Sequence, residues 1–128
     1  MIWGVLILLA LLVIVFLCGF HLRKGRFFPP GKKRFRRRWI AAQTLSDTNR
    51  RVLEGDKVLD ALLMELGFRG TLGEKLRAAE KKLADPNAVW RAHKLRNRIA
   101  HEAGFIASER EADAAMRAFE SVIRSCTR

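Results

Sequence analysis

The chain has 128 residues and a formal net charge of +12. Such a length leaves room for one small domain once an apolar N-terminal stretch is set aside, which excludes a multidomain enzyme. Nine of the positive charges fall between residues 23 and 38, whereas residues 39–128 carry sixteen basic and thirteen acidic side chains, a net charge of only +3. The positive charge therefore belongs to one short segment and is not a nucleic-acid-binding signature of the whole domain.

The first element along the chain is an apolar run, Ile2–Phe20, without a charged side chain. A helix of this length spans roughly 28 Å at 1.5 Å per residue, which is about the thickness of a hydrocarbon core. No basic residue precedes the run and no small-residue cleavage site follows it, which disfavours a cleaved signal peptide. The sequence therefore predicts a single transmembrane helix over residues 1–21. The basic residues that follow predict that the N-terminus lies outside and the C-terminal domain in the cytoplasm.

A basic segment over residues 22–38 forms the predicted linker. It contains the run Lys32–Arg38, in which Phe35 interrupts the lysines and arginines. A basic cluster beside a membrane helix attracts anionic lipid by about 1 kcal/mol per basic residue. We therefore expect Arg23–Arg38 to contact anionic lipid. The second interpretation is RNA, held by stacking on the interleaved phenylalanines and by phosphate contacts.

The next residues are helical by pattern. Apolar residues recur at helical spacing between Trp39 and Gly67, which predicts one long helix with a kink near Ser46 or Gly55. Thr71–Glu74 then has the spacing of a capping box, in which the threonine hydroxyl and the glutamate carboxylate satisfy backbone amides at the start of a helix. A short second helix is predicted to follow.

Two further helix starts are equally clear. Asp85 precedes Pro86, a cap followed by a residue that loses no hydrogen bond in the first helical turn, so a third helix begins there and Gly104 closes it. Ser108–Glu111 is a second capping box, and it opens a fourth helix that ends near Cys126. Both starts predict short connections and antiparallel neighbours.

No stretch shows the alternation of a half-buried strand, so the predicted fold class is all-α. It consists of a single transmembrane helix followed by a small antiparallel bundle of about four helices over residues 39–128. A bundle of this size has a thin core, and a second copy is a common way to bury more surface. We therefore expect a homodimer.

The predicted third helix has two contrasting faces when its residues are placed at 100° intervals. One face is apolar and is expected to pack into the bundle: Ala88, Ala92, Leu95 and Ile99. The opposite face carries residues that are unusual for a solvated surface: Trp90, His93, Asn97 and His101. This composition predicts an interface or a functional site.

Arg96-Asn97-x-x-x-His101 resembles the signature of HEPN domains, in which an arginine and a polar residue precede a histidine. The context His93–Glu102 is similar to the late helix that carries this signature. HEPN domains are small helical bundles that include metal-independent ribonucleases and also inactive members. The resemblance covers the order of the helices over residues 39–128, and it is specific at three residues, Arg96, Asn97 and His101.

The resemblance implies a metal-independent endoribonuclease in which the 2′-hydroxyl of the RNA is the nucleophile, so that neither metal nor cofactor is required. It implies that His101 is the general acid or base, that Arg96 binds the phosphate and that Asn97 orients His101. Independently, His93 and His101 lie too far apart in sequence, with no nearby cysteine, to predict a zinc site.

The remaining predicted site residues surround this motif. Three are expected to bind substrate: Arg98, Lys94 and His93. Three acids are expected to contact the motif: Asp56, Asp60 and Glu102. The alternative for Asp56 and Asp60, which share one face of the first predicted helix, is ordinary surface charge. Because Arg96 and His101 are about 140° apart around the helix, we expect a joint cleft between two copies, with Trp90 in the dimer interface. The alternative is a non-catalytic, membrane-anchored dimerisation or scaffold module in which Arg96 pairs with a carboxylate.

Overall fold

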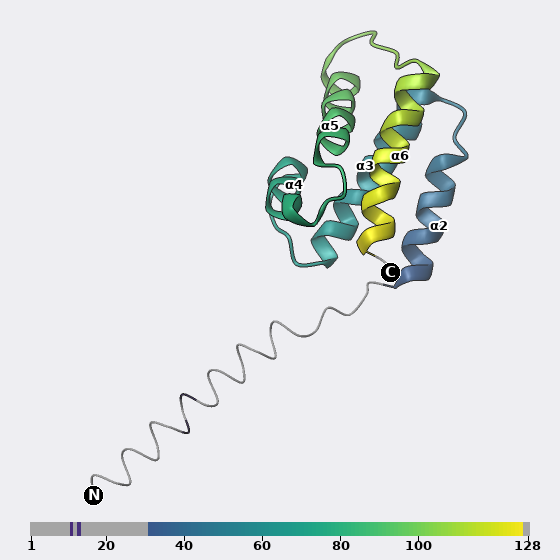
Figure 1. Cartoon of the computed structure of the whole chain (residues 1–128). Coiled ribbons are helices and arrows are strands. Elements are labelled where there is room, and N and C mark those ends of the chain that lie inside the picture. Colours follow the sequence, from purple (N-terminus) through teal and green to yellow (C-terminus); the bar gives the residue numbers. More distant parts are fainter. Residues whose placement is uncertain (1–10, 12, 14–30, 127–128) are drawn as a thin grey trace, which may run out of the picture.

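In the computed structural model, residues 11, 13 and 31–126 are described, and these residues form helices but no strand. The elements in chain order are α2 (Lys32–Gln43), α3 (Thr48–Glu65), α4 (Leu72–Ala79), the short 3₁₀ turn η1 (Glu80–Lys82), α5 (Pro86–His101) and α6 (Glu109–Cys126), shown in Figure 1. The domain is therefore all-helical, as the sequence predicted.

The prediction of a single transmembrane helix is wrong for the chain as the structure describes it, because no helix among the described residues is long and apolar enough to cross a bilayer. The longest described helices, α3 and α6, have 18 residues each and carry charged side chains along their length. The predicted span, Ile2–Phe20, lies outside the described residues except for Leu11 and Val13. This finding also removes the basis for a single-pass topology and for a cytoplasmic placement of the bundle.

The bundle is arranged around α3, which packs against α2, α5 and α6 and also contacts α4. Figure 1 shows α2 and α5 on opposite sides of the α3/α6 pair, with the short α4 beside α5. The core is built from leucine, valine and alanine together with two large aromatic side chains that are almost fully buried, Phe35 and Phe119. The arrangement leaves one outer surface formed by α2 and another formed by α4 and α5.

The helix starts that the sequence predicted are confirmed by their hydrogen bonds. Thr71 and Glu74 form a complete capping box at the start of α4. The side chain of Asp85 accepts from the backbone amide of Ala88 at 2.9 Å, and Pro86 occupies the first turn of α5. The hydroxyl and backbone amide of Ser108 both donate to the Glu111 carboxylate at the start of α6.

The predicted boundary between linker and bundle differs from the structure. The basic run is not a linker, because α2 begins at Lys32 and buries Phe35 and Trp39 in the core, with 1% and 5% of their surface exposed. The basic residues obscured this helix in the sequence, since its inward face consists of only a few apolar side chains. The bundle therefore begins near residue 31 and not at Trp39.

The long helix predicted from Trp39 to Gly67 is also divided. The chain leaves helical structure after Gln43, and Asp47 then caps α3 by accepting from the backbone amide of Arg50 at 2.6 Å. The other position considered for a kink, Gly55, is buried within the regular helix α3, where a Cβ would lie 2.7 Å from Met116 Sδ. Gly55 therefore permits close packing of α6 on α3 and does not bend the chain.

The loop between α5 and α6 is held by the first residues of α3. Asn49 Nδ2 donates to the carbonyl of Phe105 at 2.7 Å, and Asn49 Oδ1 accepts from the amide of Ala107 at 2.9 Å. Thr48 Oγ1 donates to the carbonyl of Ala107 at 2.8 Å. These three hydrogen bonds fix the chain immediately after the helix that carries the predicted motif.

Candidate functional site

The orientation of α5 differs from the one that the sequence predicted. Its buried residues are Val89, Ala92 and Leu95, whereas Ala88 and Ile99 are only partly covered. The opposite face is not an open stripe either. Of the four residues predicted for this face, Trp90, His93 and Asn97 are partly buried. His101 is exposed.

The reason is that α4 packs beside α5. A Cβ added at Gly73, near the start of α4, would lie 3.5 Å from His93 Nε2. The backbone of α4 therefore approaches the histidine ring closely. The wheel of α5 could not reveal this neighbour, because it contains no information about elements that pack against the helix.

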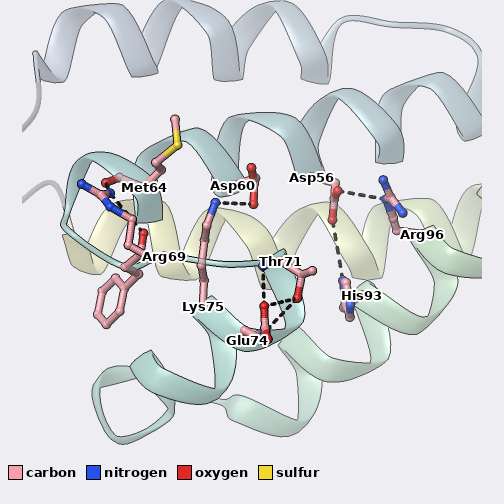
Figure 2. A network of polar contacts seen from close by, with 10 residues as sticks. Asp56, Asp60, Met64, Arg69, Thr71, Glu74, Lys75, His93 and Arg96 are labelled. Atoms are coloured by element: carbon pink, nitrogen blue, oxygen red, sulfur yellow. Dashed lines mark hydrogen bonds and ion pairs between the residues drawn. The ribbon is translucent and has the colours of Figure 1, made fainter.

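The motif is anchored by a buried carboxylate of α3. Arg96 Nε donates to Asp56 Oδ2 at 3.0 Å, and His93 Nδ1 faces Asp56 Oδ1 at 3.9 Å. Figure 2 shows Asp56 between these two side chains. The Asp56 side chain is only 6% exposed, so its charge requires a nearby cation, and Arg96 supplies it.

Asn97 connects Arg96 with His93. Arg96 Nη1 donates to Asn97 Oδ1 at 3.2 Å, and Asn97 Nδ2 lies 3.4 Å from His93 Nε2. Because Oδ1 accepts from the guanidinium, Nδ2 is left to donate to His93 Nε2, which assigns the imidazole proton to Nδ1 on the side of Asp56. The four side chains Asp56, His93, Arg96 and Asn97 thus form a polar ring, and this name is used for them below. Its fourth side is open, because His93 Nδ1 and Asp56 Oδ1 are 3.9 Å apart and both are buried without a hydrogen-bond partner among the described residues.

The polar ring borders a cleft of about 580 Å³ between α3, α5 and the start of α4. Its walls are largely polar and include the following residues: Asp56, Lys57, Asp60, Gly70, Thr71, Leu72, Gly73, His93, Arg96 and Asn97. The side chain of Arg96 is 33% exposed, so one edge of its guanidinium remains accessible. The cleft therefore offers a fixed cation to an anionic group.

The capping box of α4 forms one wall of this cleft. Hydrogen bonds from the backbone amide and the hydroxyl of Thr71 lower the pKa of the Glu74 carboxyl below its usual value of 4.5. Figure 2 shows the hydrogen bonds between Thr71 and Glu74, in which the backbone amide and hydroxyl of Thr71 donate to the carboxylate. The sequence located this capping box but did not place it next to the motif.

The predicted acids have separate roles. Asp56 contacts the motif, whereas Asp60, one turn further along α3, accepts from Lys75 Nζ at 2.9 Å (Figure 2). Glu102 pairs with Arg98 and not with Arg96. Sequence reasoning missed Lys75, which is buried and neutralises Asp60, because a lysine in a short helix gave no sign of its burial.

The other predicted site residues do not meet in the cleft. Lys94 and Arg98 line a separate groove between α5 and α6, and Arg98 also lies over the Phe105 ring at 4.1 Å from its centroid. Trp90 packs partly against the core and contacts the edge of the His93 ring. The imidazole of exposed His101, at the end of α5, makes no hydrogen bond to another described residue.

In the part of the chain that the structure describes, the arrangement is a polar cleft with paired charges and the His93 imidazole, and not a metal centre. No three histidine, cysteine or carboxylate side chains gather there as metal ligands would. Comparison of the chain with protein-family models, curated proteins and solved structures finds no significant match. Any functional assignment therefore rests on the motif and on the geometry around it.

Proposed function

We propose that this protein is a HEPN-like, metal-independent endoribonuclease. The observation that carries the proposal is the setting of Arg96. Its guanidinium is fixed by Asp56 and Asn97, yet one edge remains exposed at a polar cleft, on the same helix as the exposed imidazole of His101. A preorganised cation suits a reaction in which a phosphate gains negative charge, and His101 would supply the titratable group from a second copy of the chain.

The chemistry follows from these two groups. The 2′-oxygen of RNA forms a bond to phosphorus while the bond to the 5′-oxygen breaks. His101 takes the proton from the 2′-hydroxyl, and the departing 5′-oxygen takes a proton from solvent. Arg96 stabilises the charge that develops on the phosphate oxygens. The products are a 2′,3′-cyclic phosphate and a 5′-hydroxyl.

A second copy of the chain would complete such a site. Arg96 and His101 are about 140° apart around α5, so one exposed face cannot present both to the same phosphate. In a two-fold dimer packed across α5, Arg96 of one copy lies near His101 of the other. In such a dimer the polar ring holds Arg96 in position within one copy, and the second copy supplies His101.

The first experiment measures RNA cleavage by the full-length chain in EDTA. We expect cyclic-phosphate ends from the wild type, and a loss of about 10²-fold or more for His101→Ala, since general acid–base groups contribute roughly 10²–10⁴-fold. His21→Ala is the matched control and retains the wild-type rate. Equal cleavage by wild type and His101→Ala, or no cleavage by either, contradicts the proposal.

The second experiment tests the joint site. Arg96→Gln and His101→Ala are each expected to be inactive, but a mixture should regain about one quarter of the wild-type activity, because half of the dimers are mixed and each mixed dimer has one intact site. No recovery on mixing, with both variants folded by circular dichroism, would place Arg96 and His101 in the same subunit. Arg96→Lys, which retains the charge, controls for the loss of the Asp56 pair.

A non-catalytic interaction module is the second candidate, and a specific observation favours it. The polar ring uses the hydrogen bonds of Arg96, Asn97 and His93 on one another and on Asp56, as a purely structural cluster would. In that case Asp56→Asn lowers stability while RNA remains uncut by every variant. The cleavage assay therefore separates the two candidates.

A further inference from the structure

The outer face of α2 is the most positively charged surface of the bundle. Helix Lys32–Gln43 contains six basic residues and no acidic residue, whereas residues 44–126 contain fifteen basic and thirteen acidic residues. Lys33, Arg36 and Arg37 are exposed and form no ion pair with another described residue. Arg34 is the exception, since it lies 3.7 Å from Glu65. The bundle thus displays a rigid strip of cations without counter-charges.

A groove of about 490 Å³ runs beside this strip, between α2 and α6. Its lining combines an apolar floor with two guanidiniums and one amide: Arg36, Trp39, Ile40, Gln43, Glu120, Ile123 and Arg124. Glu120 is neutralised by Arg124, whose Nη2 lies 2.8 Å from Glu120 Oε1. The volume falls within the range of small-ligand sites, so the groove is large enough for one nucleobase.

Trp39 lines this groove and carries an unsatisfied donor that lies beneath the groove surface. Trp39 is 5% exposed, and its indole Nε1 is buried without a hydrogen-bond partner among the described residues. A Cβ built at Gly55 would lie 3.3 Å from Trp39 Cζ3, so the six-membered ring points toward α3 and the N–H edge points away from it. A buried donor without an acceptor is costly, so a ligand carbonyl or ring nitrogen would satisfy it once a small shift of the covering side chains exposed Nε1 to the groove.

We propose that α2 and the α2/α6 groove bind single-stranded RNA, with phosphates on Lys33, Arg36 and Arg37 and one base in the groove that accepts from the Trp39 indole. The choice of RNA rests on the proposed function, whereas the requirement for an anion with a flat apolar part rests on the groove itself. A single strand meets both requirements, because its bases are free to leave the stack.

An anionic lipid surface fits these observations less well. A helix that lies in a membrane interface inserts its apolar face, but the apolar face of α2 is directed into the bundle through Phe35 and Trp39. Among the large apolar residues of α2, only Ile40 is exposed. The site is also distinct from the cleft on α5, because α2 and α5 lie on opposite sides of the α3/α6 pair (Figure 1).

The first test measures binding of a fluorescein-labelled single-stranded RNA dodecamer by anisotropy between 50 and 200 mM NaCl. The full-length chain carries His101→Ala, so that the probe is not cut and binding is scored independently of catalysis. We expect Lys33→Gln/Arg36→Gln/Arg37→Gln to weaken binding at least tenfold. The slope of log affinity against log salt should fall by about 2, since each phosphate contact on a single strand contributes about 0.7.

The matched control removes three exposed cations from other helices: Arg77→Gln, Lys81→Gln and Arg110→Gln. It changes the net charge equally and is expected to weaken binding less than threefold. An equal loss in both triple variants would reduce the site to general charge attraction and overturn the proposal. An unchanged affinity in the α2 variant would overturn it as well.

The second test addresses the groove. Trp39→Phe removes the N–H but keeps an aromatic side chain, and we expect binding to weaken about 3–10-fold, the effect of one hydrogen bond. Phe68→Leu, at a partly buried ring between α3 and α4, is the control and leaves binding unchanged. If Trp39→Phe does not fold, Ile40→Glu at the exposed groove wall is compared with Ile106→Glu, an exposed residue in the α5–α6 loop. Equal affinities within either pair contradict a base in the groove.

A third arm separates RNA from lipid. Binding to vesicles of phosphatidylcholine with phosphatidylserine is measured for the same triple variants by sedimentation. We expect the Lys33→Gln/Arg36→Gln/Arg37→Gln variant to lose RNA binding by a larger factor than vesicle binding. If it loses vesicle binding and retains RNA binding, the strip is a lipid-binding surface and the proposal is overturned. Because no arm measures cleavage, an inactive enzyme that binds RNA through α2 remains distinguishable from a chain that does not bind RNA.

Discussion

The two sides of the bundle treat their charges in opposite ways. On the α5 side, Arg96 is held by Asp56 and Asn97 within the polar ring, and Lys75 is held by Asp60. On the α2 side, Lys33, Arg36 and Arg37 face solvent without a counter-charge. Paired charges fix the geometry of a site, whereas unpaired charges keep their attraction for a partner. The comparison suggests a precise cleft on one side and a non-specific binding surface on the other.

The largest expected effect tests whether the basic helix is part of the folded domain. Phe35 is 1% exposed, so Phe35→Ala should lower the free energy of unfolding by about 3–5 kcal/mol through lost burial and a cavity. Ile40→Ala in the same helix, at 49% exposure, should cost less than about 1 kcal/mol. Urea unfolding followed by circular dichroism measures both. Equal losses in the free energy of unfolding for the two variants would indicate that this segment is a linker and not part of the folded domain.

The next effect concerns the polar ring. Asp56→Ala leaves Arg96 and His93 without their acid, and removal of one partner of a buried ion pair costs about 3–5 kcal/mol. Because the Arg96 side chain is one-third exposed and water can solvate it, we expect about 2–3 kcal/mol. Asp113→Ala, at a carboxylate that is 54% exposed, serves as the control, with a change within about 0.5 kcal/mol. A loss no larger than that of the control would show that the ring does not stabilise the fold.

A smaller effect is expected at the caps that position α4 and α6. Ser108→Ala removes the hydroxyl that accepts from the Glu111 amide, and loss of such a cap costs about 1 kcal/mol. Ser121→Ala, within α6, is the comparison, since its hydroxyl bonds only to the carbonyl of Ala118. Thermal unfolding of both variants at neutral pH gives the difference. Equal melting temperatures for Ser108→Ala and Ser121→Ala would contradict a role of the Ser108–Glu111 capping box in defining the start of α6.

The same caps predict a dependence on pH. Hydrogen bonds from Ser108 lower the pKa of Glu111 below its usual value of 4.5, and Glu74 is lowered in the same way by Thr71. A carboxyl with a lowered folded-state pKa stabilises the fold above pH 4.5, and this stabilisation is lost as the pH falls through the folded-state value. Glu74→Gln/Glu111→Gln should therefore flatten the fall in melting temperature between pH 5 and pH 3. A profile as steep as that of the wild type would contradict this account.

The smallest expected effect has the opposite sign. Arg37 lies three and four residues from Arg34 and Lys33 on α2, and like charges at these spacings destabilise a helix by about 0.2–0.5 kcal/mol per pair. Arg37→Gln should therefore raise the free energy of unfolding by about 0.5 kcal/mol at low salt. The gain should disappear in 0.5 M NaCl, where the repulsion is screened. Measured destabilisation would mean that the cations of α2 have partners within the bundle.

Local signals predicted much of the fold. The capping boxes Thr71–Glu74 and Ser108–Glu111 and the Asp85–Pro86 start act within one helical turn, so the sequence contains all the information that they need. The start of α2 was missed, because the burial of Phe35 and Trp39 depends on tertiary packing, chiefly of α2 against α3. Local pattern alone describes such a segment only as basic.

The site was predicted less completely, for a related reason. Spacing on a wheel placed Asn97 and His101 on one face, but it could not show that α4 covers His93. Asp56 was considered as a contact of the motif because it lies on the first predicted helix, and it does reach Arg96. The sequence could not show which of Asp56 and Asp60 reaches Arg96. The two lie one helical turn apart on α3, and Asp60 accepts from Lys75 instead. Such tertiary choices lie beyond the reach of periodicity.

Asn49 has a consequence for where the chain can change in length. By donating to Phe105 and accepting from Ala107, one amide holds both arms of the α5–α6 loop, much as a neighbouring strand would. An insertion between these two residues would break both hydrogen bonds at once, so this loop should tolerate no added residues. The turn between α2 and α3 lacks such a clamp among the described residues, and extra residues near exposed Ser46 should be accommodated there. We therefore expect the loop that follows the motif to tolerate a change in length less well than the α2–α3 turn, although it has no regular secondary structure.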